Sequence, residues 1–80
     1  MVPLENVFPD LVARYEPPSL LLRLERQGNF SLALLYGNNG IVCSFGIAKR
    51  NVYDKEQTVN GYRLATARAL RRFWDDKNER

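Results

Sequence analysis

The sequence predicts an α+β domain of order α-β-β-β-α: a short N-terminal helix, a three-stranded antiparallel β-meander and a long C-terminal amphipathic helix packed on the sheet. Apolar residues alternate with a period of two through 19–49, as they do in strands. Gly/Asn-rich turns divide that stretch, and such short connections permit only antiparallel pairing. Residues 61–76 instead repeat apolar side chains every three or four positions, which indicates an amphipathic helix.

We expect a single domain, because 80 residues of which 45% are hydrophobic can enclose only one small core. No stretch approaches the roughly 18 apolar residues of a membrane span, and the first residues lack the features of a secretory signal. The single Cys43 cannot form an internal disulfide. These features predict a cytoplasmic protein with no membrane contact. Its expected parts are an N-terminal helical segment at 1–18, the meander at 19–49, a loop at 50–60 and the C-terminal helix at 61–76.

The N-terminal helix is predicted from helical spacing of apolar residues between Leu4 and Tyr15. Pro9 suits the first turn, where its missing N–H would have no partner in any case. Pro17 and Pro18 stop the helix, because the residue before a proline is disfavoured in the helical region. The helix should therefore run from about Pro9 to Tyr15.

Each predicted strand has one side with larger apolar residues, and we expect that side to face the C-terminal helix. The turns between the strands are 27–29 and 37–40, whose Gly and Asn residues tolerate positive φ. The side chains predicted to point inward are Leu20, Leu22, Leu24, Phe30, Leu32, Leu34, Tyr36, Ile41, Cys43, Phe45 and Ile47.

The opposite face of the predicted sheet is too apolar to be left in water, since antiparallel sheets with one solvated face usually alternate cleanly. Three covers are open: the N-terminal helix, a second copy of the chain in a homodimer, or another partner. In the last two cases Leu21, Leu35 and Val42 are interface residues. The predicted members of this face are Leu21, Arg23, Ala33, Leu35, Val42, Ser44, Gly46 and Ala48.

The C-terminal helix is expected to run from about Asn60, a candidate N-cap, to Asp76. Arg68, Arg71 and Arg72 fall on the face opposite to its apolar arc. That arc is formed by Tyr62, Ala65, Ala69, Leu70, Phe73 and Trp74.

The net charge of +3 is unevenly distributed. Between Lys49 and Arg72 the chain has seven basic residues against two acidic ones, whereas the first forty residues have three arginines against four acidic residues. A positive field of this kind accelerates encounter with nucleic acid or with an acidic protein surface. The candidate partner- or nucleic-acid-binding residues are Lys49, Arg50, Tyr53, Lys55, Arg63, Arg68, Arg71 and Arg72.

No catalytic, metal or cofactor site is expected. The chain has no histidine, the commonest general base, and no convergent set of metal ligands. A thiol on the inward side of a strand, as predicted for Cys43, behaves as a small hydrophobe. Asp75 and Asp76 lie four residues after Arg71 and Arg72, so surface ion pairs are the simplest role for them. The sequence therefore predicts a binding protein rather than an enzyme.

The predicted element order and the run from Ala65 to Leu70 are similar to the double-stranded RNA-binding domain, whose second helix is alanine-rich. This resemblance implies nucleic-acid binding, and basic residues near a helix N-terminus are suited to phosphate. The chain departs from that family in having Val59-Asn60-Gly61 where the family places a lysine pair, and in a shorter loop at 27–29.

The segments Gly46–Asn51 and Gly61–Leu70, with Asp54 between them, resemble a pattern in short uncharacterised proteins encoded by bacteriophages. That resemblance implies an inhibitor or accessory protein in the host cytoplasm that binds and blocks a host or defence nucleoprotein complex, as anti-CRISPR proteins do. Arginine and aromatic side chains, here those of the basic loop and helix, are frequent anchors of such contacts. We take this as the leading hypothesis and nucleic-acid binding as the alternative.

Overall fold

The computed structural model describes residues 1–49 and 58–78. Its antiparallel sheet has the order β1-β2-β3-β4, and helix α3 packs on it. The predicted α+β class and the position of the C-terminal helix are confirmed, but the sheet has four strands rather than three. The elements are β1 (Val2–Pro3), α1 (Leu4–Val7), α2 (Pro9–Tyr15), β2 (Leu21–Gln27), β3 (Phe30–Tyr36), β4 (Val42–Lys49) and α3 (Thr58–Asn78).

The additional strand, β1, is a two-residue segment in which Val2 pairs with Leu22 and Pro3 with Leu21. The chain then turns directly into α1, and the Leu4 N–H donates a hydrogen bond of 3.0 Å to the Leu20 carbonyl. A strand this short has no detectable alternation, so the sequence pattern could not reveal it.

Helix α2 has the predicted bounds, with Pro9 at its first position. It ends at Glu16, which adopts the left-handed conformation with φ of 47° and donates its N–H to the Val12 carbonyl at 2.8 Å. The end of α2 is joined to α3, because the Trp74 indole N–H donates a hydrogen bond of 2.8 Å to the Tyr15 carbonyl. The N-terminal helices and the end of α3 therefore form one unit.

The predicted apolar arc of α3 is confirmed, since Ala65, Ala69 and Leu70 are fully buried and Phe73 nearly so. The helix begins at Thr58, slightly before the predicted start, and ends at Asn78. Its arc contacts β4 and β3 most extensively.

The predicted orientation of β3 and β4 is wrong. Leu22 of β2 faces α3 as expected, but the register pairs it with Leu35 of β3 and pairs Leu35 with Ser44 of β4. The side chains of these two strands that face α3 are therefore mostly the small ones. Leu35 is fully buried among them and is unavailable to a partner. The buried residues of β3 and β4 are Ser31, Ala33, Leu35, Ser44, Gly46 and Ala48.

Close backbone approach explains this choice of face. A Cβ on Gly46 would lie 2.0 Å from the Ala65 carbonyl oxygen and 2.6 Å from the Ala69 nitrogen. The Ser44 hydroxyl donates a buried hydrogen bond of 2.7 Å to the Ala69 carbonyl oxygen. The alanine-rich helix is thus seated directly on the small side of β4, where a phenylalanine or isoleucine would not fit.

Cys43 also departs from its predicted inward position. The register passes from Leu35 opposite Ser44 to Tyr36 opposite Val42, so a bulge at Cys43 interrupts the ladder. Its thiol is exposed.

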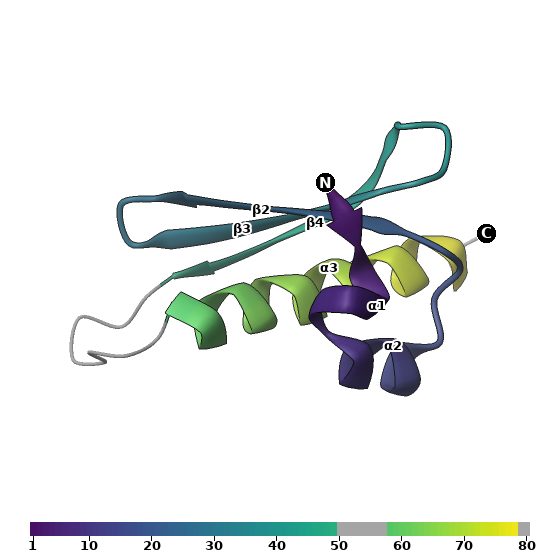
Figure 1. Cartoon of the computed structure of the whole chain (residues 1–80), viewed down its shortest axis with the longest axis horizontal. Helices are drawn as coiled ribbons and strands as arrows, with labels where there is room; N and C mark the ends of the chain where they lie inside the picture. The colour runs from purple at the N-terminus through teal and green to yellow at the C-terminus, as the bar shows by residue number, and fades with distance from the viewer. Residues whose placement is uncertain (50–57, 79–80) are drawn as a thin grey trace.

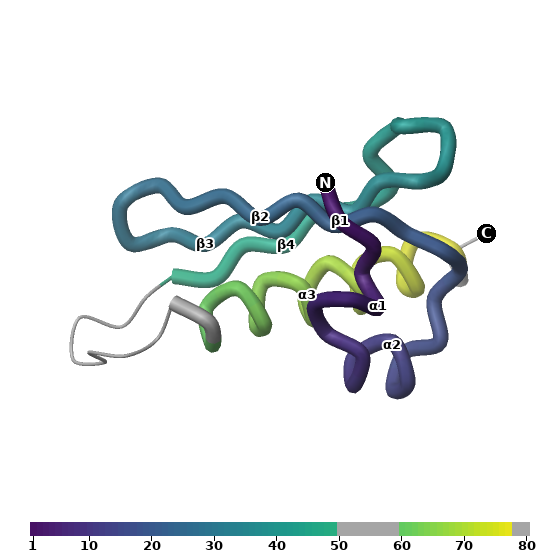
Figure 2. The backbone as a smooth tube through the Cα atoms, viewed as in Figure 1, coloured from purple at the N-terminus to yellow at the C-terminus, as the bar shows by residue number. Residues whose placement is uncertain are grey.

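All three helices lie on the same side of the sheet (Figure 1), and the tube in Figure 2 follows the N-terminal segment into that same layer. Leu4, Phe8 and Leu11 of this segment belong to one core cluster with Leu35 and Leu70. The N-terminal helix thus helps α3 to cover the face that carries Ala33 and Leu35, instead of lying on the side of the sheet away from α3. No described helix or strand lies over the opposite face, which carries Leu34 and Phe45. None of the described helices is long and apolar enough to cross a membrane.

Candidate binding surface

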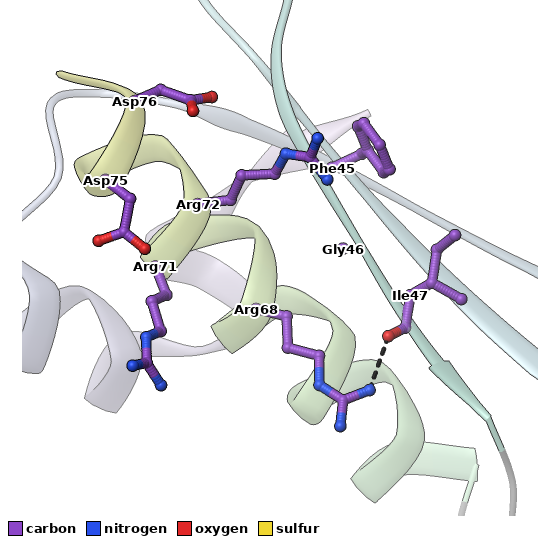
Figure 3. Close-up of a pocket in the computed structure, with 8 residues that line it drawn as sticks. All are labelled: Phe45, Gly46, Ile47, Arg68, Arg71, Arg72, Asp75 and Asp76. Atoms are coloured by element: carbon purple, nitrogen blue, oxygen red, sulfur yellow. Dashed lines mark hydrogen bonds between the residues drawn. The ribbon is translucent and has the colours of Figure 1, made fainter. Parts of the chain in front are cut away.

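A shallow hollow of about 520 Å³ lies between α3 and the outer edge of β4, and we call it the β4–α3 hollow (Figure 3). Three of the predicted binding residues, Arg68, Arg71 and Arg72, come together here. The complete lining is Phe45, Gly46, Ile47, Arg68, Arg71, Arg72, Asp75 and Asp76.

Arg68 is fixed by a hydrogen bond from its guanidinium Nη1 to the Ile47 carbonyl oxygen, 2.8 Å away. Among the described strands β4 is the last of the sheet, so none of them pairs with this carbonyl on its outer side. The contact satisfies a carbonyl acceptor at the sheet edge and holds the guanidinium beside the strand, and it uses only one of the five guanidinium N–H donors.

Arg72 is fixed by stacking, because its guanidinium carbon lies 4.3 Å from the centroid of the Phe45 ring. Figure 3 shows both Arg68 and Arg72 reaching back toward β4, while Arg71 points away from Phe45. The expectation that all three arginines lie on the face opposite to the sheet is thus wrong for Arg68 and Arg72, whose long side chains reach over the flank of the helix.

The expected ion pairs of Arg71 with Asp75 and of Arg72 with Asp76 are not formed in the structure. Between described residues, ion pairs join Arg23 to Glu25 and Arg63 to Asp10. The carboxylates of Asp75 and Asp76 instead line the β4–α3 hollow separately from the arginines. The hollow therefore presents both signs of charge to whatever enters it.

Arg63 does not belong to this group, since its guanidinium donates a hydrogen bond to the Asp10 carboxylate and ties the start of α3 to α2. This bond lowers the pKa of Asp10 below its ordinary value and raises the pKa of Arg63. Its predicted role in binding a partner competes with this contact.

Of the remaining candidates, Lys49 is exposed at the end of β4, opposite Phe30 of β3. Arg50, Tyr53 and Lys55 lie outside the described residues. Within 1–49 and 58–78, no three His, Cys, Asp or Glu side chains cluster as metal ligands would.

The second surface is the side of the sheet over which no described helix or strand lies, and we call it the open face. Phe30, Phe45 and Ile47 on it remain 48%, 38% and 47% exposed. Cross-strand pairing places the following residues on this face: Leu21, Arg23, Glu25, Gln27, Phe30, Leu32, Leu34, Tyr36, Val42, Phe45, Ile47 and Lys49.

Among the predicted interface residues, Leu21 and Val42 do lie on the open face, whereas Leu35 is buried beneath it. Side-chain size predicts that the bulky apolar residues lie in the core, which is wrong for the larger members of the open face. Small residues permit close approach of a helix and a sheet, and they indicate the true orientation of β4. They are Ser44 and Gly46 in the strand and Ala65 and Ala69 in the helix.

No family model, curated protein or solved structure matches the chain. The resemblances to double-stranded RNA-binding domains and to bacteriophage proteins therefore stay hypotheses.

Proposed function

We propose that this protein is a non-enzymatic binding protein whose β4–α3 hollow holds an acidic segment of a partner protein. The observation that supports this most directly is that two arginines of the hollow are held in place by β4, Arg68 by the Ile47 carbonyl and Arg72 by the Phe45 ring. No described carboxylate forms an ion pair with either one.

Preorganised guanidinium groups make effective carboxylate receptors. A guanidinium offers five N–H donors in a planar fork that matches a carboxylate, and one hydrogen bond to Ile47 leaves most of those of Arg68 for a ligand. Because the side chains are already restrained, less rotamer entropy is lost on binding. Phe45 adds an apolar, aromatic contact beside the charges, as is common at the centres of protein interfaces.

The carboxylates of Asp75 and Asp76 favour a protein partner over nucleic acid. They line the same hollow as the three arginines, so a uniform polyanion meets repulsion at that end of α3. A protein segment can place a carboxylate near Arg68 and Arg72 and a basic or polar group near the two aspartates. Electrostatic complementarity of this kind supports specificity and rapid association.

The proposed mechanism is occlusion, in which the chain covers a functional surface of its target without chemical change. The resemblance to bacteriophage proteins supports a host or defence nucleoprotein complex, such as a CRISPR effector, as the target, and the host cytoplasm as the place of action. Nucleic-acid binding stays the second candidate, since Arg68, Arg71 and Arg72 can also donate to phosphate.

Fluorescence anisotropy separates the two candidates. The probes are labelled peptides rich in Asp and Glu, duplex DNA, duplex RNA and single strands, each titrated across a salt series. The proposal predicts peptide binding that weakens more than tenfold in Arg68→Glu combined with Arg72→Glu. It also predicts wild-type affinity in a matched control, Arg14→Glu together with Arg26→Glu, which changes the net charge by the same amount outside both the hollow and the open face.

Binding to nucleic acid alone, with an affinity that falls steeply with salt, would favour the second candidate. Equal loss of peptide binding in both double variants would refute the assignment to the hollow. The target itself can be sought by pull-down from host cells, with nucleic-acid extraction and mass spectrometry, comparing wild type with the Arg68/Arg72 variant.

A further inference from the structure

The open face has the anatomy of an interface. Leu32 and Leu34 occupy its middle strand, Phe45 and Ile47 lie beside them on β4, and the ion pair of Arg23 with Glu25 borders them on β2. A hollow of about 290 Å³ is sunk into one end and lined by Glu25, Gln27, Phe30, Leu32 and Ile47. An apolar centre with a polar border is typical of surfaces that bind another protein.

We propose that the open face is the interface of a two-fold symmetric homodimer. The register supplies the symmetry, because side chains of the open face fall in rows across the three strands. One row contains Arg23, Leu34 and Phe45, and the next row on the same face contains Glu25, Leu32 and Ile47. Between them lies the inward-facing row of Leu24, Ala33 and Gly46.

A two-fold axis that crosses the strands above this central row exchanges its two neighbours. Arg23 of one copy then lies opposite Glu25 of the second copy, Leu34 lies opposite Leu32, and Phe45 lies opposite Ile47. Each contact occurs twice, as an isologous interface requires. The two sheets would pack face to face with roughly aligned strands, at the spacing of about 10 Å found between packed sheets.

The two-fold arrangement also gives the charged side chains Arg23 and Glu25 partners of opposite sign. Glu25 and the already paired Arg23 make the open face a poor platform for nucleic acid, which needs unpaired cations. In the dimer each of these side chains gains a second partner of opposite sign. The hollow near Phe30 lies opposite Tyr36 and Leu34 of the second copy, which have the size to fill it.

The interface is small, so association should be weak. Three strands of about seven residues cover a flat area on the order of 300 Å². Protruding side chains add to this area, but it stays below the ~800 Å² that each partner buries in a standard interface. We therefore expect a dissociation constant in the micromolar range, and association must be measured over a wide concentration range.

Sedimentation equilibrium of the whole chain is the first test. The apparent mass should rise from 9.3 kDa toward twice that value as concentration increases. Leu34→Asp should stay monomeric with an unchanged circular dichroism spectrum, because this side chain lies outside the core. A wild-type chain that is monomeric even at about 1 mM would overturn the proposal.

A charge-reversal pair tests the symmetry itself. Arg23→Glu places four carboxylates across the axis and Glu25→Arg places four guanidinium groups there, so each variant alone should be monomeric. Mixed together they should form a heterodimer, because every opposed pair then has opposite charge. Failure of the mixture to associate, or undiminished dimers of either single variant, would refute this arrangement.

The dimer proposal does not depend on the proposed function, although Phe45 and Ile47 border both the hollow and the open face. Arg68→Glu with Arg72→Glu should leave the sedimentation behaviour unchanged while abolishing peptide binding, and Leu34→Asp should do the reverse. Loss of both properties in either variant would contradict the independence of peptide binding and dimerisation.

Discussion

Gly46 of β4 and Ala65 of α3 meet so closely that a side chain on the glycine would collide with the helix backbone, its Cβ 2.0 Å from the Ala65 carbonyl oxygen. The contact sets the distance between α3 and the sheet. It therefore also sets how far Arg68 and Arg72 must extend to reach Ile47 and Phe45.

Gly46→Ala should destabilise the protein, because backbone atoms of the helix cannot rotate away from the new methyl group. Overpacking of this kind costs about 1–3 kcal/mol, and each kcal/mol lowers the unfolding midpoint by roughly 4–8 °C in a domain of this size. Thermal unfolding followed by circular dichroism measures it. Gly28→Asn is the control, since Gly28 has φ of 56° with no atom near its Cβ position and asparagine tolerates that conformation. Equal stability of Gly46→Ala and wild type would contradict the observed approach.

The orientation of β3 is tested by truncating two neighbouring leucines. Leu35 is fully buried and Leu34 lies on the open face. Leu35→Ala should lower the free energy of unfolding by about 2–5 kcal/mol, whereas Leu34→Ala should change it by less than about 1 kcal/mol. Urea unfolding at the lowest practical concentration keeps dimer association from contributing. The reversed order of effects would favour the orientation expected from side-chain size.

These two leucines also show what could be predicted from the sequence and what could not. A period of two identifies a strand and separates its residues into two sets, but it does not say which set faces the helix. Side-chain size predicts that the set containing Leu34 and Phe45 faces the helix. Backbone approach selected the set containing Leu35 and Gly46, because the alanine-rich arc of α3 brings main-chain atoms against the strand.

The candidate site, too, could be predicted from the sequence only in part. Helical spacing predicts that Arg68, Arg71 and Arg72 are neighbours on α3, since residues three and four apart adjoin on a helix. It also predicts that all three point away from the sheet, which is wrong for Arg68 and Arg72. It could not show that Arg68 would bond to Ile47 or that Arg72 would stack on Phe45, because these contacts depend on the position of β4. Long-range contacts of this kind leave no local pattern in a sequence.

Trp74→Phe should loosen the attachment of α3 to α2, because it removes the donor that satisfies the Tyr15 carbonyl. We expect a loss of about 0.5–1.5 kcal/mol, measured by urea unfolding monitored with circular dichroism, since Trp74 is the only tryptophan and its fluorescence is lost. Tyr15→Phe retains the main-chain carbonyl and serves as the control. Unfolding of Trp74→Phe at the same urea concentration as wild type would contradict a stabilising role of this hydrogen bond.

The ion pair of Asp10 and Arg63 should add an acid-sensitive contribution to stability. The folded pKa of Asp10 is below its ordinary value because Arg63 donates to the charged carboxylate. The unfolded chain therefore takes up a proton first, at about pH 4, and the stabilisation is present above that pH and is lost as the pH falls through the lower folded pKa.

Asp10→Asn should flatten the dependence of the unfolding midpoint on pH below about pH 4. Arg63→Gln should flatten it similarly, and the double variant should add nothing further, as expected for one shared interaction. Thermal unfolding at closely spaced pH values provides the measurement. Parallel curves for wild type and Asp10→Asn throughout the acid range would rule out the contribution.

The hydrogen bond from Arg68 to the Ile47 carbonyl also affects how far assembly can proceed. The rim of a β-sheet is a template on which further chains can add strand by strand until a fibril grows. On the β4 rim an incoming strand must first displace a charged side chain. The proposed face-to-face dimer would end with two molecules, so this arginine would limit further association through the sheet edge.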